Sequence, residues 1–260
     1  MTGTYEAAIL DLDGTVYLGE RLVPGAGECV GSLREDGVDV LFLTNKAIER
    51  RRDYAEKLER LGVPATREDV INSGWVTARY AARNHPDRRA FVVGEDPLVE
   101  ELESAGVPVT REEPGELLVA SMDREFSYET LELALRTAET GAPFIATNPD
   151  RTCPTDGDPI PDAAGMIGAI EGVSGRTVDA MLGKPSPTMV ETALGRLDAD
   201  PGSCLMVGDR LETDIRMGNE AGMTTVLVLS GVSDRSTLAG HEVEPDHVID
   251  SLGSLREVLG

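Results

Sequence analysis

The stretch from Ala7 to Thr15 reads Ala-Ala-Ile-Leu-Asp-Leu-Asp-Gly-Thr and places two carboxylates directly after a short apolar run. An unbroken apolar run of this length predicts a buried strand of a parallel sheet. Open α/β sheets bind their ligands at the carboxyl ends of the strands, so the acids are expected at a binding edge. Because Asp11 and Asp13 are two residues apart, their side chains point to the same side of an extended chain.

Two carboxylates this close repel each other unless a cation lies near them, and paired oxygen ligands suit Mg²⁺. A carboxylate can also attack phosphorus and form an aspartyl-phosphate. The structural alternative is a strand end followed by an Asp-Gly turn, which occurs in proteins of every function. Taken alone, residues 11–15 fit both interpretations.

Strand and helix patterns alternate along the rest of the chain, which is typical of a parallel α/β sheet. In the two ends of the chain we predict strands at 38–43, 204–207 and 225–228, and helices at 26–35, 48–61, 73–82, 187–197 and 212–221. Between them a second series predicts strands at 91–94, 117–120 and 143–147, and helices at 97–104, 128–139 and 163–171. The middle of the chain therefore reads as a second α/β unit inserted into the first.

The charge composition excludes one class of partner. The chain of 260 residues is 40% hydrophobic, which is enough for a core, and has a formal net charge of −23. Such a charge repels nucleic acid, so we expect no nucleic-acid partner. Only three of the 24 basic residues are lysines, namely Lys46, Lys57 and Lys184. An acidic, lysine-poor chain is typical of a halophilic cytoplasm, where salt screens the self-repulsion, although ordinary acidic proteins share this bias.

The apolar segments and the cysteines predict a cytoplasmic protein with no membrane partner. No apolar stretch approaches the length of a membrane span, and the first apolar run begins too close to Met1 to leave room for a signal peptide. Cys29, Cys153 and Cys204 are odd in number and far apart, which predicts neither a metal cluster nor a disulfide framework.

Three further segments place polar residues where an expected strand ends or an expected helix begins. Thr44-Asn45 offers a hydroxyl and main-chain N–H groups that suit phosphate oxygens, although it also fits a helix N-cap. Lys184, in Gly-Lys-Pro-Ser-Pro, could pair with Asp11 or face solvent. Asp209 and Asp214 could complete a Mg²⁺ site or stabilise the start of a helix.

The order of these motifs resembles that of the haloacid dehalogenase superfamily. Its four motifs look like Asp11-Leu12-Asp13-Gly14-Thr15, Thr44-Asn45, Lys184, and Gly208-Asp209 with Asp214. The long insert between the second and third motifs resembles the C2-type cap of the NagD-type phosphatases, subfamily IIA. The stretches that carry this second resemblance are Phe91–Gly94, Asp123–Tyr128, Phe144–Asp150 and, near the end of the chain, Leu229–Val232.

The resemblance implies an α/β fold, with a Rossmann-like parallel-sheet core and an inserted α/β cap. We expect residues 1–82 and 181–260 to form the core and residues 83–180 to form the C2-type cap. It also implies a Mg²⁺-dependent phosphoric monoester hydrolase. The implied substrates are small phosphomonoesters such as sugar phosphates, phosphoglycolate, glycerol phosphate or nucleoside monophosphates.

The resemblance assigns roles to the core residues. Asp11 would be the nucleophile that forms the aspartyl-phosphate, and Asp13 would protonate the leaving group and then activate water. Thr44, the main chain of Asn45 and the ammonium of Lys184 would bind the phosphoryl oxygens.

The same resemblance implies how Mg²⁺ is held and where the cap contacts substrate. The side chains of Asp11 and Asp209 and the main-chain carbonyl of Asp13 would ligate the ion, and Asp214 would orient a metal-bound water. Substrate contacts in the cap are expected from one loop, at Asn148, Asp150, Arg151 and Thr152.

The remaining chemistry-bearing residues are expected to be structural. We interpret Cys153 as incidental because no histidine partner is evident, and Trp75 as a helix-packing residue. His85, His241 and His247 fall in loop-like sequence and are expected at the surface. Related proteins often pair through the cap, so a homodimer is expected.

Three other functions are considered. A phosphotransferase of the same superfamily usually carries a cap between the first two motifs, but residues 17–44 are too few for one. A non-catalytic module that binds phosphometabolites is expected to lack Asp11 or Asp13, and both are present. A Rossmann-type dinucleotide binder is excluded because no Gly-x-Gly-x-x-Gly follows the first strand.

Overall fold

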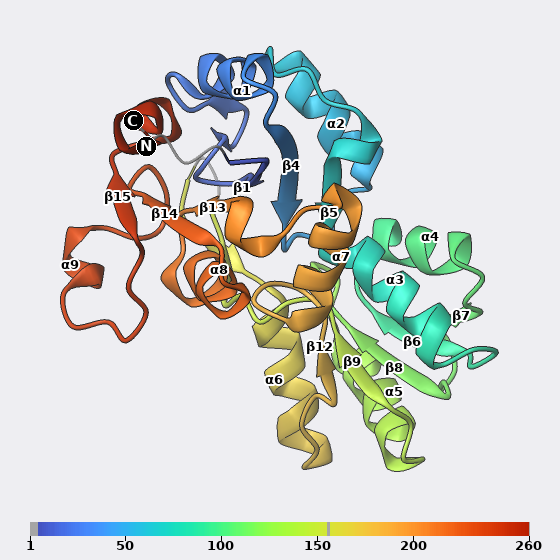
Figure 1. Cartoon of the computed structure of the whole chain (residues 1–260). Helices are drawn as coiled ribbons and strands as arrows, with labels where there is room; N and C mark the ends of the chain where they lie inside the picture. The colour runs from blue at the N-terminus through green and yellow to red at the C-terminus, as the bar shows by residue number, and fades with distance from the viewer. Residues whose placement is uncertain (1–4, 155–156, 260) are drawn as a thin grey trace.

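Two parallel sheets organise the computed structural model of the chain, which describes residues 5–154 and 157–259. Figure 1 shows one sheet in the upper lobe, formed by both ends of the chain, and the other in the lower lobe, formed by its middle. The predicted ranges 1–82, 83–180 and 181–260 and the first residues after Met1 include positions 1–4, 155–156 and 260, which lie outside the described residues.

The core sheet has six strands, and every neighbouring pair is parallel. Their spatial order is β15 (His247–Ile249), β14 (Thr224–Val228), β13 (Cys204–Gly208), β1 (Ala7–Asp11), β4 (Asp39–Thr44) and β5 (Val70–Asn72). All five residues of β1 are buried, as expected of a central strand covered on both faces.

Helices cover both faces of the core sheet. On one face, Leu10 and Phe42 pack with the buried side of α1 (Ala26–Glu35) and α2 (Arg51–Arg60). On the other face lie α3 (Ser73–Asn84), α7 (Pro187–Leu197) and α8 (Arg216–Ala221). This alternation of faces explains why β1 is apolar throughout and carries its charge only at its end.

The cap sheet has five strands, again parallel throughout. Their spatial order is β12 (Ala180–Met181), β9 (Phe144–Ala146), β8 (Leu117–Ala120), β6 (Ala90–Val93) and β7 (Val109–Thr110). One face packs on α5 (Tyr128–Glu139) and α6 (Ala163–Ser174), and the opposite face packs on α4 (Asp96–Ser104).

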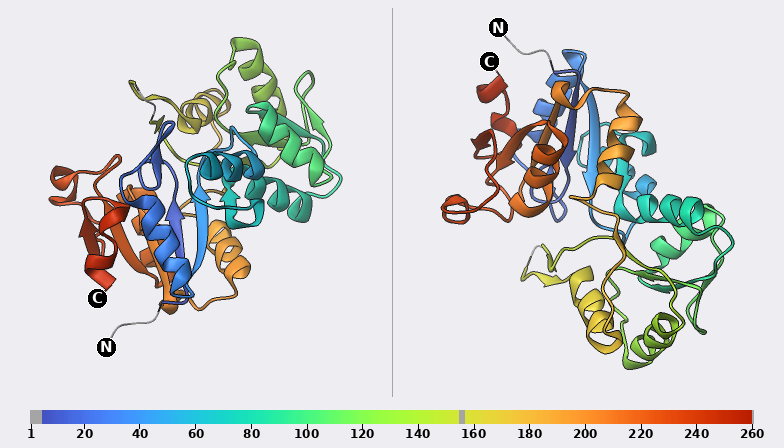
Figure 2. Two further views of the ribbon diagram at one scale, coloured as in Figure 1. Left: turned by 90° about the horizontal axis from the view of Figure 1, so that it is seen from above. Right: turned by 60° about the horizontal axis from the view of Figure 1, so that its bottom comes forward.

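The two sheets are connected by a continuous hydrophobic cluster. Side chains from β1 and β4 belong to the same cluster as Val92 and Val119 of the cap sheet, with α3 and α4 between them. Figure 2 shows the two lobes from two further directions, with the α3–α4 region at their junction. Two short antiparallel strand pairs occur besides these sheets: β2 (Tyr17–Leu18) with β3 (Arg21–Leu22), and β10 (Thr152–Cys153) with β11 (Ile160–Pro161).

The predicted α/β class is confirmed, and most predicted elements occur within a few residues of their expected bounds. The helices expected at 128–139 and 187–197 have those same ends. The helix expected at 48–61 begins later, at Arg51. The helix expected at 212–221 begins as a π-helical turn, Leu211–Ile215, before α8. The loop assignment of His247 is wrong, because it begins β15.

The short elements η1 (Arg67–Asp69), η2 (Pro201–Ser203), α9 (Arg235–Leu238), η4 (Leu252–Ser254) and α10 (Arg256–Leu259) connect or follow the main ones. Within residues 5–154 and 157–259, no helix combines the length and the apolar character that crossing a membrane requires.

Candidate active site

Asp11 and Lys184 form the buried centre of the site. Asp11 is the last residue of β1, and the Lys184 ammonium donates a hydrogen bond to its Oδ1. The same ammonium lies 2.7 Å from Oδ1 of Asp214. All three side chains are buried, so two carboxylates share one lysine out of reach of bulk water. The sequence interpretation of Lys184 as a partner of Asp11 is the one that the structure shows.

Asp209 adds a third carboxylate to this group. It follows β13, and its Oδ2 accepts a hydrogen bond of 2.7 Å from the main-chain N–H of Val232. Asp11, Asp209 and Asp214 each offer one oxygen that lies within 4.8 Å of the other two. A Cβ at Gly14 would lie 2.5 Å from Oδ2 of Asp209, and one at Gly231 would overlap the same carboxylate. The glycines therefore let the main chain approach the carboxylate closely.

The pKa values of Asp11 and Asp209 are raised above their ordinary range. Burial raises the pKa of Asp209 to about 7, and the negative charge of Asp214 adds to the effect. Burial also raises the pKa of Asp11, against the attraction of Lys184, with Asp214 and Asp209 contributing in the same direction as burial. One lysine is thus too little positive charge for three buried acids.

Asp13 faces the same space from the other side. Its Oδ1 accepts a hydrogen bond of 2.7 Å from the Lys46 ammonium. Its Oδ2 is buried and has no hydrogen-bond partner among the described residues. Burial lowers the pKa of Lys46, but the attraction of Asp13 and a contact with Cys153 outweigh this effect, so the net shift is upward.

Lys46 was missed as a site residue at the level of sequence. The signal that could have found it was present, because it is one of three lysines in an acidic chain and directly follows Thr44-Asn45. Lys184 was noted in the sequence because lysine is rare in this chain, and the same reasoning applies to Lys46.

Thr44 and Asn45 lie where β4 ends, and both are buried. Oδ1 of Asn45 accepts a hydrogen bond of 2.7 Å from the main-chain N–H of Lys184, and Nδ2 donates one of 3.2 Å to the carbonyl of Lys184. The Asn45 side chain therefore fixes the main chain that carries the lysine. The hydroxyl of Thr44 accepts a hydrogen bond of 3.2 Å from the N–H of Lys46.

The cap loop contacts the core at the same place. Nδ2 of Asn45 also donates to Oδ2 of Asp150 at 3.1 Å, and Nδ2 of Asn148 donates to the Asn45 carbonyl at 2.9 Å. The Arg210 guanidinium lies 3.6 Å from Oδ1 of Asp150 and donates to the carbonyl of Thr152 at 2.9 Å. These contacts tie residues 148–152 to the core site.

The contacts enclose a catalytic hollow of about 30 Å³. Its lining includes six residues that the sequence indicated: Asp11, Asp13, Thr44, Asn45, Asp150 and Lys184. Five more were not foreseen: Lys46, Pro154, Asp162, Arg210 and Thr213. The hollow is not lined by Asp209 and Asp214, which lie next to Asp11, nor by Asn148, which is buried in the junction. Arg151 and Thr152 line a neighbouring groove instead.

Asp162 is a buried acid on the cap side of the hollow. It is the N-cap of α6, and its Oδ1 accepts a hydrogen bond of 2.6 Å from the N–H of Ala163. Burial raises its pKa to about 6, although that hydrogen bond and Lys46 act in the opposite direction. Nothing in the local sequence distinguished Asp162 from an ordinary helix cap.

The residues at the centre of the site fit a divalent cation. Three buried carboxylates lie close together with one ammonium, which contacts only Asp11 and Asp214. Hard oxygen ligands are what Mg²⁺ prefers, and Asp13 Oδ2 has no partner among the described residues. The glycines around Asp209 keep the space free of side chains. The predicted ligand set of Asp11, Asp13 and Asp209 is thus compatible with the structure.

The residues interpreted as structural have ordinary surroundings. Burial raises the pKa of the Cys153 thiol, which disfavours the thiolate needed for nucleophilic attack. Trp75 packs at the start of α3, with the guanidinium groups of Arg51 and Arg79 at 4.2 and 4.9 Å from its ring centre.

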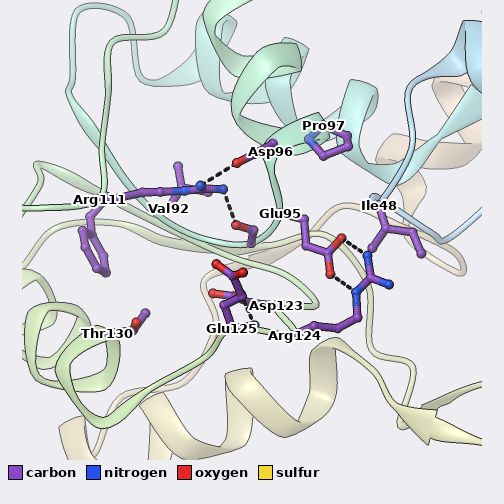
Figure 3. Close-up of a pocket in the computed structure, with 12 residues that line it drawn as sticks. Ile48, Val92, Glu95, Asp96, Pro97, Arg111, Asp123, Arg124, Glu125 and Thr130 are labelled. Atoms are coloured by element: carbon purple, nitrogen blue, oxygen red, sulfur yellow. Dashed lines mark hydrogen bonds and ion pairs between the residues drawn. The ribbon is translucent and has the colours of Figure 1, made fainter.

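A larger cavity, which we call the cap hollow, lies at the carboxyl ends of β6 and β8 and has a volume of about 550 Å³ (Figure 3). Asp123, Glu125 and Thr130 line one side of it, and Arg111 and Arg124 project into it. Ile48 reaches it from the core.

Two family models match the chain. A model described as haloacid dehalogenase-like hydrolase matches residues 8–108, and one described as HAD-hydrolase-like matches residues 181–255. Among characterised relatives, the sugar-phosphatase AraL of Bacillus subtilis is 36% identical, over 94% of this chain and 89% of that protein.

Solved structures extend the likeness over the whole fold. A 4-nitrophenylphosphatase from Thermotoga maritima has a TM-score of 0.93 at 35% identity and covers 100% of this chain and 99% of its own. NagD from E. coli has a TM-score of 0.88 at 31% identity, covering 97% and 98%. A glycerol phosphate phosphatase from Mycobacterium tuberculosis, solved with magnesium, has a TM-score of 0.88 at 30% identity, covering 96% and 76%.

Proposed function

The chain belongs to the haloacid dehalogenase-like hydrolase family, and on this premise we propose that it is a Mg²⁺-dependent phosphatase that hydrolyses small phosphomonoesters through an aspartyl-phosphate. It is a NagD-type member of subfamily IIA. The observation that carries the proposal is the buried Asp11, held by Lys184 at a sheet edge beside Asp209, Asp214 and Asp13.

In the first half-reaction, an oxygen of the Asp11 carboxylate attacks phosphorus. The bond between phosphorus and the ester oxygen breaks, and the leaving alkoxide takes a proton from Asp13. The hydrogen bond from Lys184 orients Asp11, and the hydrogen bond from Lys46 orients Asp13. This step leaves a covalent aspartyl-phosphate and a free alcohol.

In the second half-reaction, the carboxylate of Asp13 takes a proton from water, whose oxygen attacks the phosphorus of the aspartyl-phosphate. The bond between phosphorus and Asp11 breaks, so inorganic phosphate is released and both acids return to their starting states. Because Asp150 and Pro154 of the cap line the same hollow, the cap limits access of bulk water to the intermediate.

Phosphoryl oxygens would be held by Thr44, the main-chain N–H of Asn45 and the ammonium of Lys184. The support for this assignment is that all three residues line the catalytic hollow. Lys184 would therefore serve both the nucleophile and the transferring group.

Asp11, Asp209 and the Asp13 main-chain carbonyl would hold Mg²⁺, which when bound offsets the repulsion between an anionic nucleophile and an anionic ester. Asp214 accepts a hydrogen bond of 3.0 Å from the N–H of Arg210 and forms an ion pair with Lys184 at 2.7 Å, which suits a residue that orients groups around the ion.

The substrate is proposed to be a sugar phosphate, glycerol phosphate, phosphoglycolate or nucleoside monophosphate. Relatives named sugar-phosphatase, dihydroxyacetone phosphatase, 5'-nucleotidase and glycerol phosphate phosphatase support this range. We assign selection among these to residues 83–180 as the cap, with Asn148, Asp150, Arg151 and Thr152 as its contact loop.

Three broader properties are also part of the proposal. A cytoplasmic location is supported by three cysteines that are all free and buried. Adaptation to high salt is supported by the net charge of −23. A homodimer through the cap, without nucleic-acid or membrane partners, completes the proposal.

The test is phosphate release from a panel of phosphomonoesters, with and without Mg²⁺ and with and without molar KCl. We expect Mg²⁺-dependent turnover that Asp11→Asn abolishes, and a stimulation by KCl if the chain is salt-adapted. If folded protein with Mg²⁺ releases phosphate from no ester, the phosphatase proposal fails.

A further inference from the structure

The catalytic hollow is too small for a whole substrate. Its volume of about 30 Å³ is far below the roughly 300 Å³ at which pockets for organic ligands begin. The phosphoryl group can enter it, but the leaving group of an ester must extend into an adjoining space. Two larger spaces come into question: the cap hollow and the neighbouring groove lined by Arg151.

The cap hollow is poorly suited to an anionic ester. Both of its arginines already have partners. Arg111 donates hydrogen bonds to Asp96 at 2.7 Å and to the Gly94 carbonyl at 2.6 Å. Arg124 forms a bidentate ion pair with Glu95. Figure 3 shows these pairs along the wall of the cavity. Among the residues that the structure describes, its lining has no member in common with that of the catalytic hollow.

The other space, which we call the junction groove, has a volume of about 540 Å³ and adjoins the catalytic hollow. The two linings share Asp150, Arg210 and Thr213, which come from the cap loop and from the segment after β13. A molecule whose phosphoryl group lies in the hollow can therefore extend into this groove over the Asp150–Arg210 pair.

The junction groove carries positive charge in an acidic protein. Arg151, Arg210 and Arg216 line it, against Asp150 and Glu212. Arg210 is occupied by Asp150 and by the carbonyl of Thr152. The other two arginines of the groove, Arg151 and Arg216, are notable in a chain whose net charge is −23.

Arg151 and Arg216 have no acidic partner within 4.0 Å in the described part of the chain. Nε of Arg216 is buried and has no hydrogen-bond partner there either. A buried guanidinium N–H without an acceptor costs free energy, and the Arg216 side chain lines the groove with no ion pair to offset this cost among the described residues. The planar fork of arginine matches the oxygens of both a carboxylate and a phosphate.

We propose that the junction groove binds a second anionic group on the leaving group of the substrate, with Arg151 and Arg216 as its ligands. The preferred substrates are then phosphomonoesters that carry a carboxylate or a second phosphate. This inference rests on the proposed phosphatase function and narrows its substrate class.

The test compares kcat/KM for matched esters. The carboxylate arm pairs 2-phosphoglycolate with 2-hydroxyethyl phosphate, and the phosphate arm pairs fructose 1,6-bisphosphate with fructose 6-phosphate. The native protein is expected to favour the bis-anionic member of at least one pair. The arm in which it does so identifies the anionic group.

Arg216→Gln and Arg151→Gln are expected to lower the ratio of bis-anionic to mono-anionic kcat/KM by roughly 10-fold to 100-fold each, mainly through KM, because each removes a charged hydrogen bond. The matched control is Arg124→Gln, an arginine of the cap hollow, which is expected to leave the ratio within about twofold. Thermal melts of all three variants establish that they fold. Since Arg151 is exposed, its variant tests the proposal even if Arg216→Gln does not fold.

The inference is overturned if the native protein shows no preference for either bis-anionic ester. It is equally overturned if Arg216→Gln and Arg151→Gln lower kcat/KM for both esters of a pair by the same factor. The same holds if Arg124→Gln alters the ratio of the two kcat/KM values as much as they do. Failure of the proposed function is a separate result, because the native protein would then hydrolyse neither member of any pair.

Discussion

The core sheet and the cap sheet have the same parallel architecture, yet their carboxyl edges carry different chemistry. The core edge presents Asp11 and Asp209 together with Lys184 from a distant segment. The cap edge presents the hydroxyls of Ser121 and Thr147, which hydrogen-bond each other at 2.8 Å. It also presents the charged residues of the cap hollow, whose two arginines are paired with Asp96 and Glu95. The core edge therefore gathers acids that one lysine does not balance, whereas each arginine at the cap edge is paired with an acid.

The two regions also treat buried acids differently. In the core, Asp11 and Asp214 share the Lys184 ammonium. In the cap, Asp162 is almost as deeply buried, but no lysine or arginine lies within 4.0 Å of its carboxylate in the described chain. The comparison predicts that removing the Lys184 ammonium lowers the stability of the protein, whereas removing the Asp162 charge raises it.

The largest expected effect is that of Lys184→Met. It leaves two buried carboxylates without their cation, so we expect a loss of about 3–5 kcal/mol in the free energy of unfolding at neutral pH. Urea unfolding measures the loss. The double variant Lys184→Met/Asp214→Asn is expected to lose less, because one of the two uncompensated charges is gone. Equal losses in the single and double variants would contradict charge compensation as the cause.

Asp162→Asn is expected to have the opposite sign. Burial raises the pKa of Asp162 from 3.8 to about 6, so the folded state resists ionisation and this group lowers the stability as pH rises from about 4 to 6. Asparagine keeps the helix cap without the charge. The variant should therefore gain up to about 3 kcal/mol over the native protein above pH 7 and nothing below pH 4.

Urea unfolding between pH 4 and 8 checks this dependence, and Asp234→Asn supplies a matched control. Asp234 also caps a helix, but it is exposed, and hydrogen bonds from Ser236 and Thr237 lower its pKa. Its contribution to stability is present above the unfolded pKa and is lost as pH falls. A gain for Asp162→Asn that does not change with pH would show that ionisation is not the cause.

Asp209→Asn tests the core edge as a cation site. Replacing one carboxylate ligand is expected to weaken Mg²⁺ binding on the order of 100-fold, equal to about 2.7 kcal/mol. Calorimetric titration with Mg²⁺ measures this without turnover. The cap variant Asp123→Asn is the control and should leave Mg²⁺ binding unchanged. Unaltered affinity in Asp209→Asn would remove this residue from the ligand set.

The smallest expected effects come from one helix cap in each lobe. Asn72 caps α3 through a hydrogen bond of 2.8 Å from Trp75 N–H and also donates to the Glu49 carbonyl. Ser127 caps α5 through a bond of 3.2 Å from Thr130 N–H. We expect Asn72→Ala to cost about 1–2 kcal/mol and Ser127→Ala about 0.5–1 kcal/mol, since of the two residues only Asn72 is buried. Equal costs by urea unfolding would refute this ranking.

Much of the fold followed from local sequence alone. The apolar run before Asp11 predicted β1, and the alternation of strand and helix patterns predicted α5 and α7 with the ends they have. Periodicity and capping act within a few residues, so the sequence displays them directly. The strands β5 and β15 were missed, because three residues carry no recognisable period and only pairing with β4 and β14 makes them strands.

The residues of the site, too, were in part predictable from the sequence and in part determined only by the tertiary structure. The order of the motifs was enough to nominate Asp11, Asp13 and Lys184 and to identify the family. Only the tertiary structure brought Lys46 to Asp13 and Asp150 to Asn45, buried Asp162 with no ion pair among the described residues, and opened a groove beside the catalytic hollow. These features depend on contacts between segments as many as 105 residues apart, such as Asn45 and Asp150. A local sequence pattern shows which chemical groups the chain has, whereas the tertiary structure decides which of them come into contact and how exposed to water they are.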